Sequence, residues 1–219
     1  MDYSPAVDGC CNPGGYDETF TDRSAQRKAT RYRARGLDKT AARMVELITS
    51  HGIDGATVLE IGGGVGQIQI ELLKRGAARA TNLELSESYE QHAQQLLAET
   101  GMTERVQRRI VDIAAGSDDV EPADVVVLHR VVCCYPDYAR LLGAVADHAR
   151  RLVVFSHPPR NAASRFTFGA ENLGFRLRGS QFRVFTHSPG AMLEVLRSHG
   201  MRGSSIHRAL WWHIAVAQR

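Results

Sequence analysis

The chain has 219 residues, 43% of them hydrophobic, and this suits one α/β domain with a core of its own. Its formal net charge is +3, from 27 basic and 24 acidic residues, and this balance is too mild to require a nucleic-acid partner. No stretch reaches the ~18 apolar residues of a membrane span, and residues 1–16 lack the apolar core of a signal peptide. We therefore expect a cytoplasmic protein with no membrane partner.

Residues 1–36 are predicted to form an N-terminal arm and a helix. The arm, residues 1–17, is rich in proline and glycine and is expected to be irregular. The stretch 20–35 is dense in arginine and predicts an exposed basic helix, for which we favour a solvated face over a surface that contacts RNA. Residues 37–219 are predicted to form a single domain that opens with an amphipathic helix over 37–50.

A glycine-rich turn follows the first predicted strand. Residues 57–61 form a β-branched and aliphatic run typical of a buried parallel strand, and residues 67–74 repeat apolar residues at helical spacing. The turn between them contains four glycines: Gly62, Gly63, Gly64 and Gly66. Glycine allows positive φ and lets a ligand approach the backbone closely, while amides at the start of the next helix face that ligand. This turn is therefore the candidate binding loop.

The spacing of the glycines separates two ligand classes. A dinucleotide fingerprint, G-x-G-x-x-G, needs a third glycine at position 67, where this chain has Gln67. The pattern that fits is acidic-x-Gly-x-Gly-x-Gly, with Glu60, Gly62, Gly64 and Gly66 in register. It resembles motif I of the class I S-adenosylmethionine-dependent methyltransferases.

The resemblance covers residues 37–219 and implies a fold and a cofactor. The implied fold is α/β, a Rossmann-like doubly wound sheet of seven strands with the last strand antiparallel, here with an N-terminal helical extension. The implied cofactor is S-adenosyl-L-methionine, leaving S-adenosyl-L-homocysteine, with contacts from Glu60 and the four glycines. Later strands are expected over 79–85, 106–111, 123–128, 151–155, 201–207 and 210–217, and later helices over 88–100, 138–149 and 188–199.

Two acidic residues stand at the ends of predicted strands. Glu84 ends the second strand, where a carboxylate can accept hydrogen bonds from both ribose hydroxyls, and Leu85 follows it. Asp112 and Ile113 follow the third strand. The resemblance places Asp112 at the exocyclic amine of the adenine and Ile113 over the adenine ring.

Two histidines are candidate catalytic bases. His129 follows the fourth strand, and its unperturbed pKa near 6.5 suits removal of a hydroxyl proton; alternatively it packs under the adenosine and hydrogen-bonds a carbonyl group. His157 follows the fifth strand and is the second candidate. An Asn or Asp followed by Pro-Pro-aromatic, which holds a planar nitrogen in many methyltransferases of this class, is missing after the fourth strand.

Residues 158–187 are predicted to form a substrate lid. The stretch 160–185 is rich in arginine, phenylalanine and glycine and has no clear periodicity. Its pocket-lining candidates are Phe166, Phe168, Phe175, Arg176 and Phe182. They suit an aromatic or anionic acceptor.

The four cysteines form two adjacent pairs, Cys10 with Cys11 and Cys133 with Cys134. This spacing is unlike a secreted disulfide framework, so reduced thiols are expected. The two pairs could meet and bind a soft metal or arsenite, but cysteine is more often a small buried apolar residue, and we expect no resident metal.

Together these residues favour a methyltransferase that acts on a small molecule, at oxygen. Three alternatives remain: an RNA-modifying methyltransferase, an arsenite methyltransferase, and a non-catalytic module that binds S-adenosylmethionine. The sequence leaves the acceptor and the oligomeric state undetermined.

Overall fold

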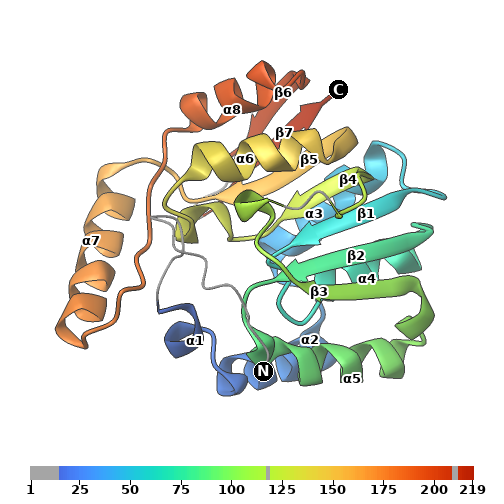
Figure 1. Ribbon diagram of the computed structural model, residues 1–219, viewed down its shortest axis with the longest axis horizontal. Coiled ribbons are helices and arrows are strands. Elements are labelled where there is room, and N and C mark those ends of the chain that lie inside the picture. The colour runs from blue at the N-terminus through green and yellow to red at the C-terminus, as the bar shows by residue number, and fades with distance from the viewer. Residues whose placement is uncertain (1–14, 117–118, 209–211) are drawn as a thin grey trace, which may run out of the picture.

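The computed structural model describes residues 15–116, 119–208 and 212–219 (Figure 1). It forms a seven-stranded sheet in the order β3-β2-β1-β4-β5-β7-β6. The strands are β1 Thr57–Ile61, β2 Arg79–Glu84, β3 Val106–Ile110, β4 Ala123–Leu128, β5 Ala149–His157, β6 Arg202–His207 and β7 His213–Gln218. Within the described residues, no helix is both long enough and apolar enough to cross a bilayer.

Strand β7 is antiparallel to both of its neighbours, whereas β1 to β5 pair in parallel. The predicted Rossmann-like sheet with an antiparallel last strand is therefore confirmed. The strand order reverses between β1 and β4, and the carboxyl ends of strands at such a switch point form the usual ligand crevice of this architecture.

Helices cover both faces of the sheet (Figure 1). They are α1 Tyr16–Thr19, α2 Asp22–Arg35, α3 Lys39–Ser50, α4 Gln67–Lys74, α5 Glu90–Thr100, α6 Tyr138–Asp147, α7 Ala162–Leu177 and α8 Pro189–Ser198. Short 3-10 helices add η1 Glu87–Tyr89, η2 Thr103–Arg105, η3 Ile113–Ala115 and η4 Val132–Cys134.

The side chains of β4 show how the two faces are filled. Val125 and Val127 pack against α3 and α4, while Val126 and Leu128 pack against α6 and α8. All four side chains are fully buried, because neighbouring residues of a strand point to opposite faces and both faces are covered. A continuous apolar run is therefore the expected sequence for this central strand.

Helix α2 corrects the prediction of a wholly exposed basic helix. Ala25, Ala29 and Tyr32 are buried along one side, which packs on α4 and α5. The Tyr32 hydroxyl also donates a 2.7 Å hydrogen bond to Glu71. The small alanines let the helix approach the domain closely, while its arginines other than Arg31 remain on the outer side. The proposed division of the chain at residue 36 stays a prediction.

Residues 162–177 correct a second expectation, because a segment without clear periodicity forms the regular helix α7. The helix contains Gly169 and Gly174 and has no buried residue, which makes it unlike a helix that covers the core. Phe168 and Phe175 line a cavity, whereas Phe166 and Leu177 are 79% and 80% exposed. Figure 1 shows α7 standing clear of the sheet, beyond one end of its strands.

Candidate active site

A cavity of about 540 Å³ lies at the carboxyl ends of the central strands. Its size is within the range of small-molecule sites. The glycine loop and the ends of β2 and β4 form one side, and α1, α2 and α7 close the other. From the sequence candidates it brings together Glu60, Gly62, Gly63, Gly64, Glu84, Leu85, Asp112, Ile113, His129, Phe168, Phe175 and Phe182.

The glycine loop has the backbone conformation that its sequence predicts. Gly62, Gly64 and Gly66 have φ angles of 61°, 58° and 78°, in the left-handed region that favours glycine. A Cβ atom on Gly62 would lie 2.6 Å from Val131 Cγ2. A Cβ atom on Gly63 would overlap the side chain of Asn82. The loop is therefore glycine-rich for packing against the protein as well as for ligand approach.

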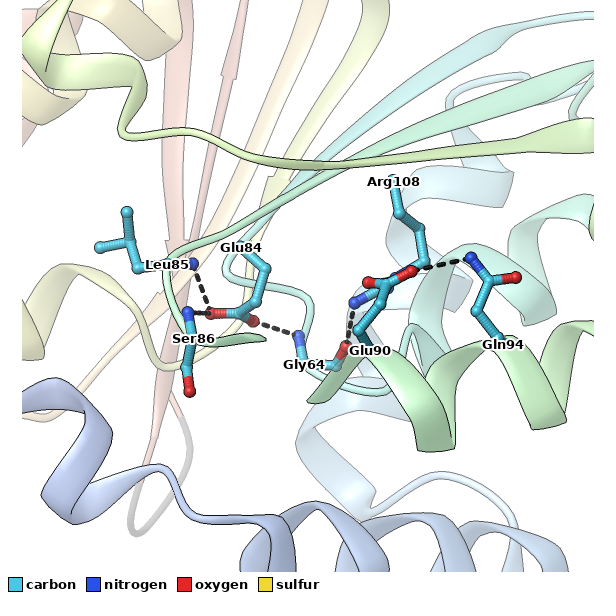
Figure 2. A network of polar contacts seen from close by, with 7 residues as sticks. All are labelled: Gly64, Glu84, Leu85, Ser86, Glu90, Gln94 and Arg108. Atoms are coloured by element: carbon cyan, nitrogen blue, oxygen red, sulfur yellow. Dashed lines mark hydrogen bonds and ion pairs between the residues drawn. The ribbon is translucent and has the colours of Figure 1, made fainter. Parts of the chain in front are cut away.

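Glu84 ties this loop to the end of β2 (Figure 2). One carboxylate oxygen accepts a 2.7 Å hydrogen bond from the Gly64 amide. The other accepts hydrogen bonds from the amides of Leu85, at 2.8 Å, and Ser86, at 3.4 Å. A carboxylate offers about four acceptor positions, so one is open and the long Ser86 contact is easily replaced. Glu84 thus retains the capacity to accept two hydroxyl groups.

Arg108 fixes the other backbone group of Gly64. Its Nη2 donates a 2.9 Å hydrogen bond to the Gly64 carbonyl oxygen, and its Nε donates a 2.8 Å bond to Glu90 (Figure 2). Gln94 supports Glu90 through a further 2.7 Å bond. The side chain of Arg108 is only 2% exposed. The sequence analysis missed this arginine, because a charged residue in an outer strand is normally solvated.

Glu60 lies beneath the loop and is fully buried. Its carboxylate accepts a 3.1 Å hydrogen bond from the amide of Gln69 and so supports the first turn of α4. Burial raises the pKa of Glu60 to about 8, an effect that nearby Glu84 reinforces and Arg108 opposes. Glu60 therefore combines its place in the motif with a structural role behind the loop.

Asp112 and Ile113 also lie in the cavity wall. Asp112 accepts hydrogen bonds from the Ala114 amide and from the Tyr135 hydroxyl, both at 2.9 Å. Ile113 is 3% exposed and belongs to the core beneath α6. Their contacts with an adenine ring stay a prediction. Tyr135, which orients the carboxylate, was not among the sequence candidates.

His129 is hydrogen-bonded at one ring nitrogen and faces a carboxylate with the other. The Ser156 hydroxyl lies 3.0 Å from Nδ1 and accepts a 2.8 Å hydrogen bond from the Arg130 amide. Nε2 lies 3.5 Å from Asp38. Burial lowers the pKa of His129, and the nearby Asp38 only partly opposes this effect. The imidazole is therefore neutral at neutral pH.

Asp38 is a site residue that sequence analysis missed. One of its oxygens caps α3 by accepting hydrogen bonds from the amides of Thr40 and Ala41. The other faces His129 and lies 3.3 Å from the Arg130 guanidinium. Burial would raise the pKa of Asp38, but contacts with His129 and Ala41 and the charge of Arg130 outweigh it and hold that pKa well below its usual value. An ionised carboxylate therefore lines the cavity.

His157 is separated from this group. It is 2% exposed, its Nδ1 lies 2.9 Å from the carbonyl oxygen of Pro158, and its ring packs edge-on against His213. It is not among the residues that line the cavity. Burial lowers its pKa as well. The structure thus brings only one of the two candidate bases to the site.

An aromatic cluster joins the lid to the N-terminal helices. Phe182 packs edge-on against Tyr16, Phe20 and Phe175, with ring centroids 5.6, 5.5 and 5.1 Å apart. Of the predicted lid residues, Phe166 and Arg176 do not reach the cavity. Further lining residues that the sequence analysis missed are Tyr16, Phe20, Lys28, Arg31, Arg130, Glu171 and Trp212.

Cys133 and Cys134 line the same cavity as free thiols. Cys10 and Cys11 lie outside the described residues, so the meeting of the two pairs stays a prediction.

Comparison with known family models finds one match, which covers part of the chain. Residues 58–152 match the family model described as a methyltransferase domain. No curated protein matches the chain. The matched residues include the glycine loop, Glu84, Asp112 and His129. They do not include α1, α2 or the predicted lid.

Several solved structures share the fold. Magnesium protoporphyrin IX methyltransferase from Synechocystis PCC 6803, with bound S-adenosylhomocysteine, superposes with a TM-score of 0.70 at 19% identity, over 92% of this chain and 96% of that one. An O-methyltransferase family protein from Burkholderia thailandensis gives 0.67 at 18% identity, over 92% and 63%. Human N-acetylserotonin methyltransferase, in complex with S-adenosylmethionine, gives 0.66 at 15% identity, over 99% and 60%. At these identities the likeness establishes the fold.

Replacing Glu84 should weaken binding at the loop. Glu84→Ala removes the acceptor for two hydroxyls and releases the Gly64 amide, and at ~1.5 to 3 kcal/mol per charge-assisted bond S-adenosylhomocysteine should bind at least tenfold more weakly. Isothermal calorimetry measures the change. Glu87→Ala, an exposed acid nearby, is the matched control and should bind normally. Equal affinity of both variants would refute the role of Glu84.

Burial of Glu60 predicts a pH-dependent stability. Its pKa is about 8 in the folded protein against an ordinary value of 4.5, so the folded state retains a proton that the unfolded state has lost. The stabilisation from that proton is complete below the unfolded value and is lost as the pH rises through the folded value. As the pH rises from 4.5 to about 8 and beyond, the free energy of unfolding measured in urea should fall for wild type relative to Glu60→Gln. Parallel pH profiles would contradict the shift.

Proposed function

We propose that this S-adenosylmethionine-dependent methyltransferase, whose methyltransferase domain covers residues 58–152, methylates an ionised oxygen of a small aromatic molecule. The observation that carries the proposal is the division of one cavity into two halves. One half contains the glycine loop with Glu84, Asp112 and the cations of α2, and the other contains the aromatic rings of α7 and Phe182 with Glu171 and Arg130. Such a division suits a cofactor and an acceptor held against each other.

The cofactor half fits S-adenosylmethionine. Glu84 has acceptor capacity for the ribose hydroxyls, and Gly62 and Gly64 present backbone without side chains. We assign Asp112 and Ile113 to the adenine. The cofactor supplies a methyl group on a positively charged sulfonium, and the protein's task is to hold the acceptor oxygen in line with it.

Lys28 and Arg31 of α2 face the same cavity. Lys28 donates a 3.0 Å hydrogen bond to the Tyr89 hydroxyl, and Tyr89 lies against Gly64. A cation beside the loop suits the carboxylate of the cofactor's methionine portion. The inner side of α2 faces this cavity, so this side of the helix does not favour an RNA-modifying function.

The acceptor half favours a flat ring that carries a negative charge. Phe168, Phe175 and Phe182 offer ring faces and edges, and aromatic pairs contribute ~0.5 to 1.5 kcal/mol beyond the area they bury. Arg130 extends over the Trp212 ring, with 4.9 Å from the guanidinium carbon to the ring centroid, and remains 44% exposed. An anionic group on the acceptor would find this guanidinium.

For His129 the geometry favours positioning over proton transfer. Ser156 is hydrogen-bonded to Nδ1, and Nε2 faces Asp38, which also lies 3.3 Å from Arg130. An acceptor oxygen that is already ionised, in a carboxylate or phenolate, needs no base. An acceptor that is already ionised is therefore consistent with a His129 that does not act as a base.

The function is tested by methyl transfer from radiolabelled S-adenosylmethionine to a panel of aromatic carboxylates, phenols, amines and transfer RNA. Label should enter carboxylates or phenols, and a methyl ester releases volatile methanol in base. Label confined to amines or transfer RNA would overturn the oxygen assignment.

Shortening a lid ring should affect the acceptor alone. Phe175→Ala removes a cavity wall and should raise the acceptor KM about tenfold or more, while S-adenosylhomocysteine affinity stays within twofold. Phe166→Ala is the matched control on the outer face of the same helix and should change neither quantity. Steady-state kinetics and calorimetry give the two readouts. An unchanged KM in Phe175→Ala would exclude the lid from the acceptor site.

Replacing His129 distinguishes its two roles. In His129→Gln, S-adenosylhomocysteine affinity and thermal stability should fall together, and kcat should fall by less than tenfold. Because the imidazole stays neutral, the wild-type kcat should be flat from about pH 7 upwards. A loss of ~10² or more in kcat at unchanged affinity, with a rate that rises with pH, would instead identify a general base.

A further inference from the structure

Two neighbouring thiols in the acceptor half have no part in the proposed methyl transfer. Cys133 and Cys134 belong to η4, and their sulfur atoms lie 3.7 Å apart. Both line the cavity, Cys133 deeply buried and Cys134 partly exposed. The pair is therefore reachable by a molecule that enters the acceptor half.

The backbone of the pair is held from two sides. The Tyr16 hydroxyl donates a 2.7 Å hydrogen bond to the carbonyl oxygen of Cys134, and the Phe185 amide donates a 2.7 Å bond to that of Cys133. Both sulfur atoms lie 3.7 Å from the Arg130 carbonyl oxygen. The two thiols are thus fixed on one side of the cavity with their sulfurs converging.

The sulfur separation of 3.7 Å is that of two thiols in direct S–H···S contact. A small rotation of either side chain would let both sulfurs bond one atom. A structural zinc ion needs four ligands, and the described residues contain no group of three or more His, Cys, Asp or Glu that could hold a metal. A ligand that needs only two sulfurs fits better.

We propose that Cys133 and Cys134 form a bidentate site for a trivalent arsenical that carries one carbon substituent, with the substituent in the aromatic half of the cavity. Arsenic(III) is thiophilic, and two sulfurs with one carbon complete its three bonds. Two As–S bonds form and two As–O bonds break, and each thiol proton leaves with a hydroxide as water. No oxidant or reductant is required. The site does not depend on methyl transfer.

The contact with Cys134, followed by burial, raises the pKa of Cys133 well above its usual value, so Cys133 is a thiol before binding and its proton leaves with a departing water molecule. The aromatic rings of Phe175 and Phe182 provide an apolar surface for an aryl substituent.

The probe for the test is phenylarsine oxide, added to the full-length Cys10→Ser/Cys11→Ser protein so that only one cysteine pair remains. Intact-mass spectrometry should show a protein that has gained one phenylarsenic group and lost two thiol hydrogens. A dithiol such as 2,3-dimercaptopropanol should remove it, whereas the same concentration of thiol groups as 2-mercaptoethanol should not. Adding Cys134→Ser should weaken binding at least 100-fold, because a chelate becomes a single bond.

Two results would overturn the site. One is an adduct whose affinity survives Cys134→Ser, and the other is no adduct in a protein whose two thiols react with a small disulfide reagent. Circular dichroism confirms that each variant is folded. Binding of S-adenosylhomocysteine to the same Cys10→Ser/Cys11→Ser protein tests the cofactor assignment separately, so failure of one proposal is distinguishable from failure of the other.

Discussion

The candidate site depends on how the backbone of Gly64 is held. Both backbone groups of Gly64 bind side chains from neighbouring strands, its amide to Glu84 and its carbonyl oxygen to Arg108. These bonds join β1, β2 and β3 at the point where a ligand meets the backbone. Because both side chains are buried, loss of either would leave an uncompensated charge or an unpaired backbone group, each costing more than the bond itself contributes. These two side chains therefore add to the loop's own backbone hydrogen bonds, from Gly62 to Leu83 and from Gly66 to Gly63.

The two halves of the cavity differ in where their residues lie along the chain. Most of the proposed cofactor half comes from the stretch that the methyltransferase family model matches, residues 58–152, and Lys28 and Arg31 of α2 complete it. The acceptor half also draws on Tyr16, Phe175 and Trp212, which lie near the start of the chain, in the lid and near its end. The family match accordingly reaches the cofactor half and leaves the acceptor open. The aromatic cluster around Phe182 joins the first two of these segments, and Arg130 contacts Trp212 of the third.

The sequence predicted the cofactor half of the cavity better than the acceptor half. Residues 57–61 and 67–74 were predicted exactly, because a short apolar run, closely spaced glycines and a helical period are all local signals. Glu84 and Asp112 were placed in the cavity by their positions at strand ends. Asp38 was not foreseen, because its partners are distant in sequence. The lid helix was missed because it contains two glycines, Gly169 and Gly174, and because none of its residues is buried, so the usual signals of a core-facing helix are weak.

Arg130 shows a conflict between folding and site geometry. Its φ of 60° makes it the single residue other than glycine with positive φ among the described residues, and a side chain there costs of order 1 kcal/mol or more. That backbone turn sends the guanidinium towards Asp38 and over Trp212. Selection for thermal stability alone would therefore favour glycine or asparagine at position 130, and a more robust protein would result with an altered cavity. Position 130 is thus one to hold constant in any engineering of this chain.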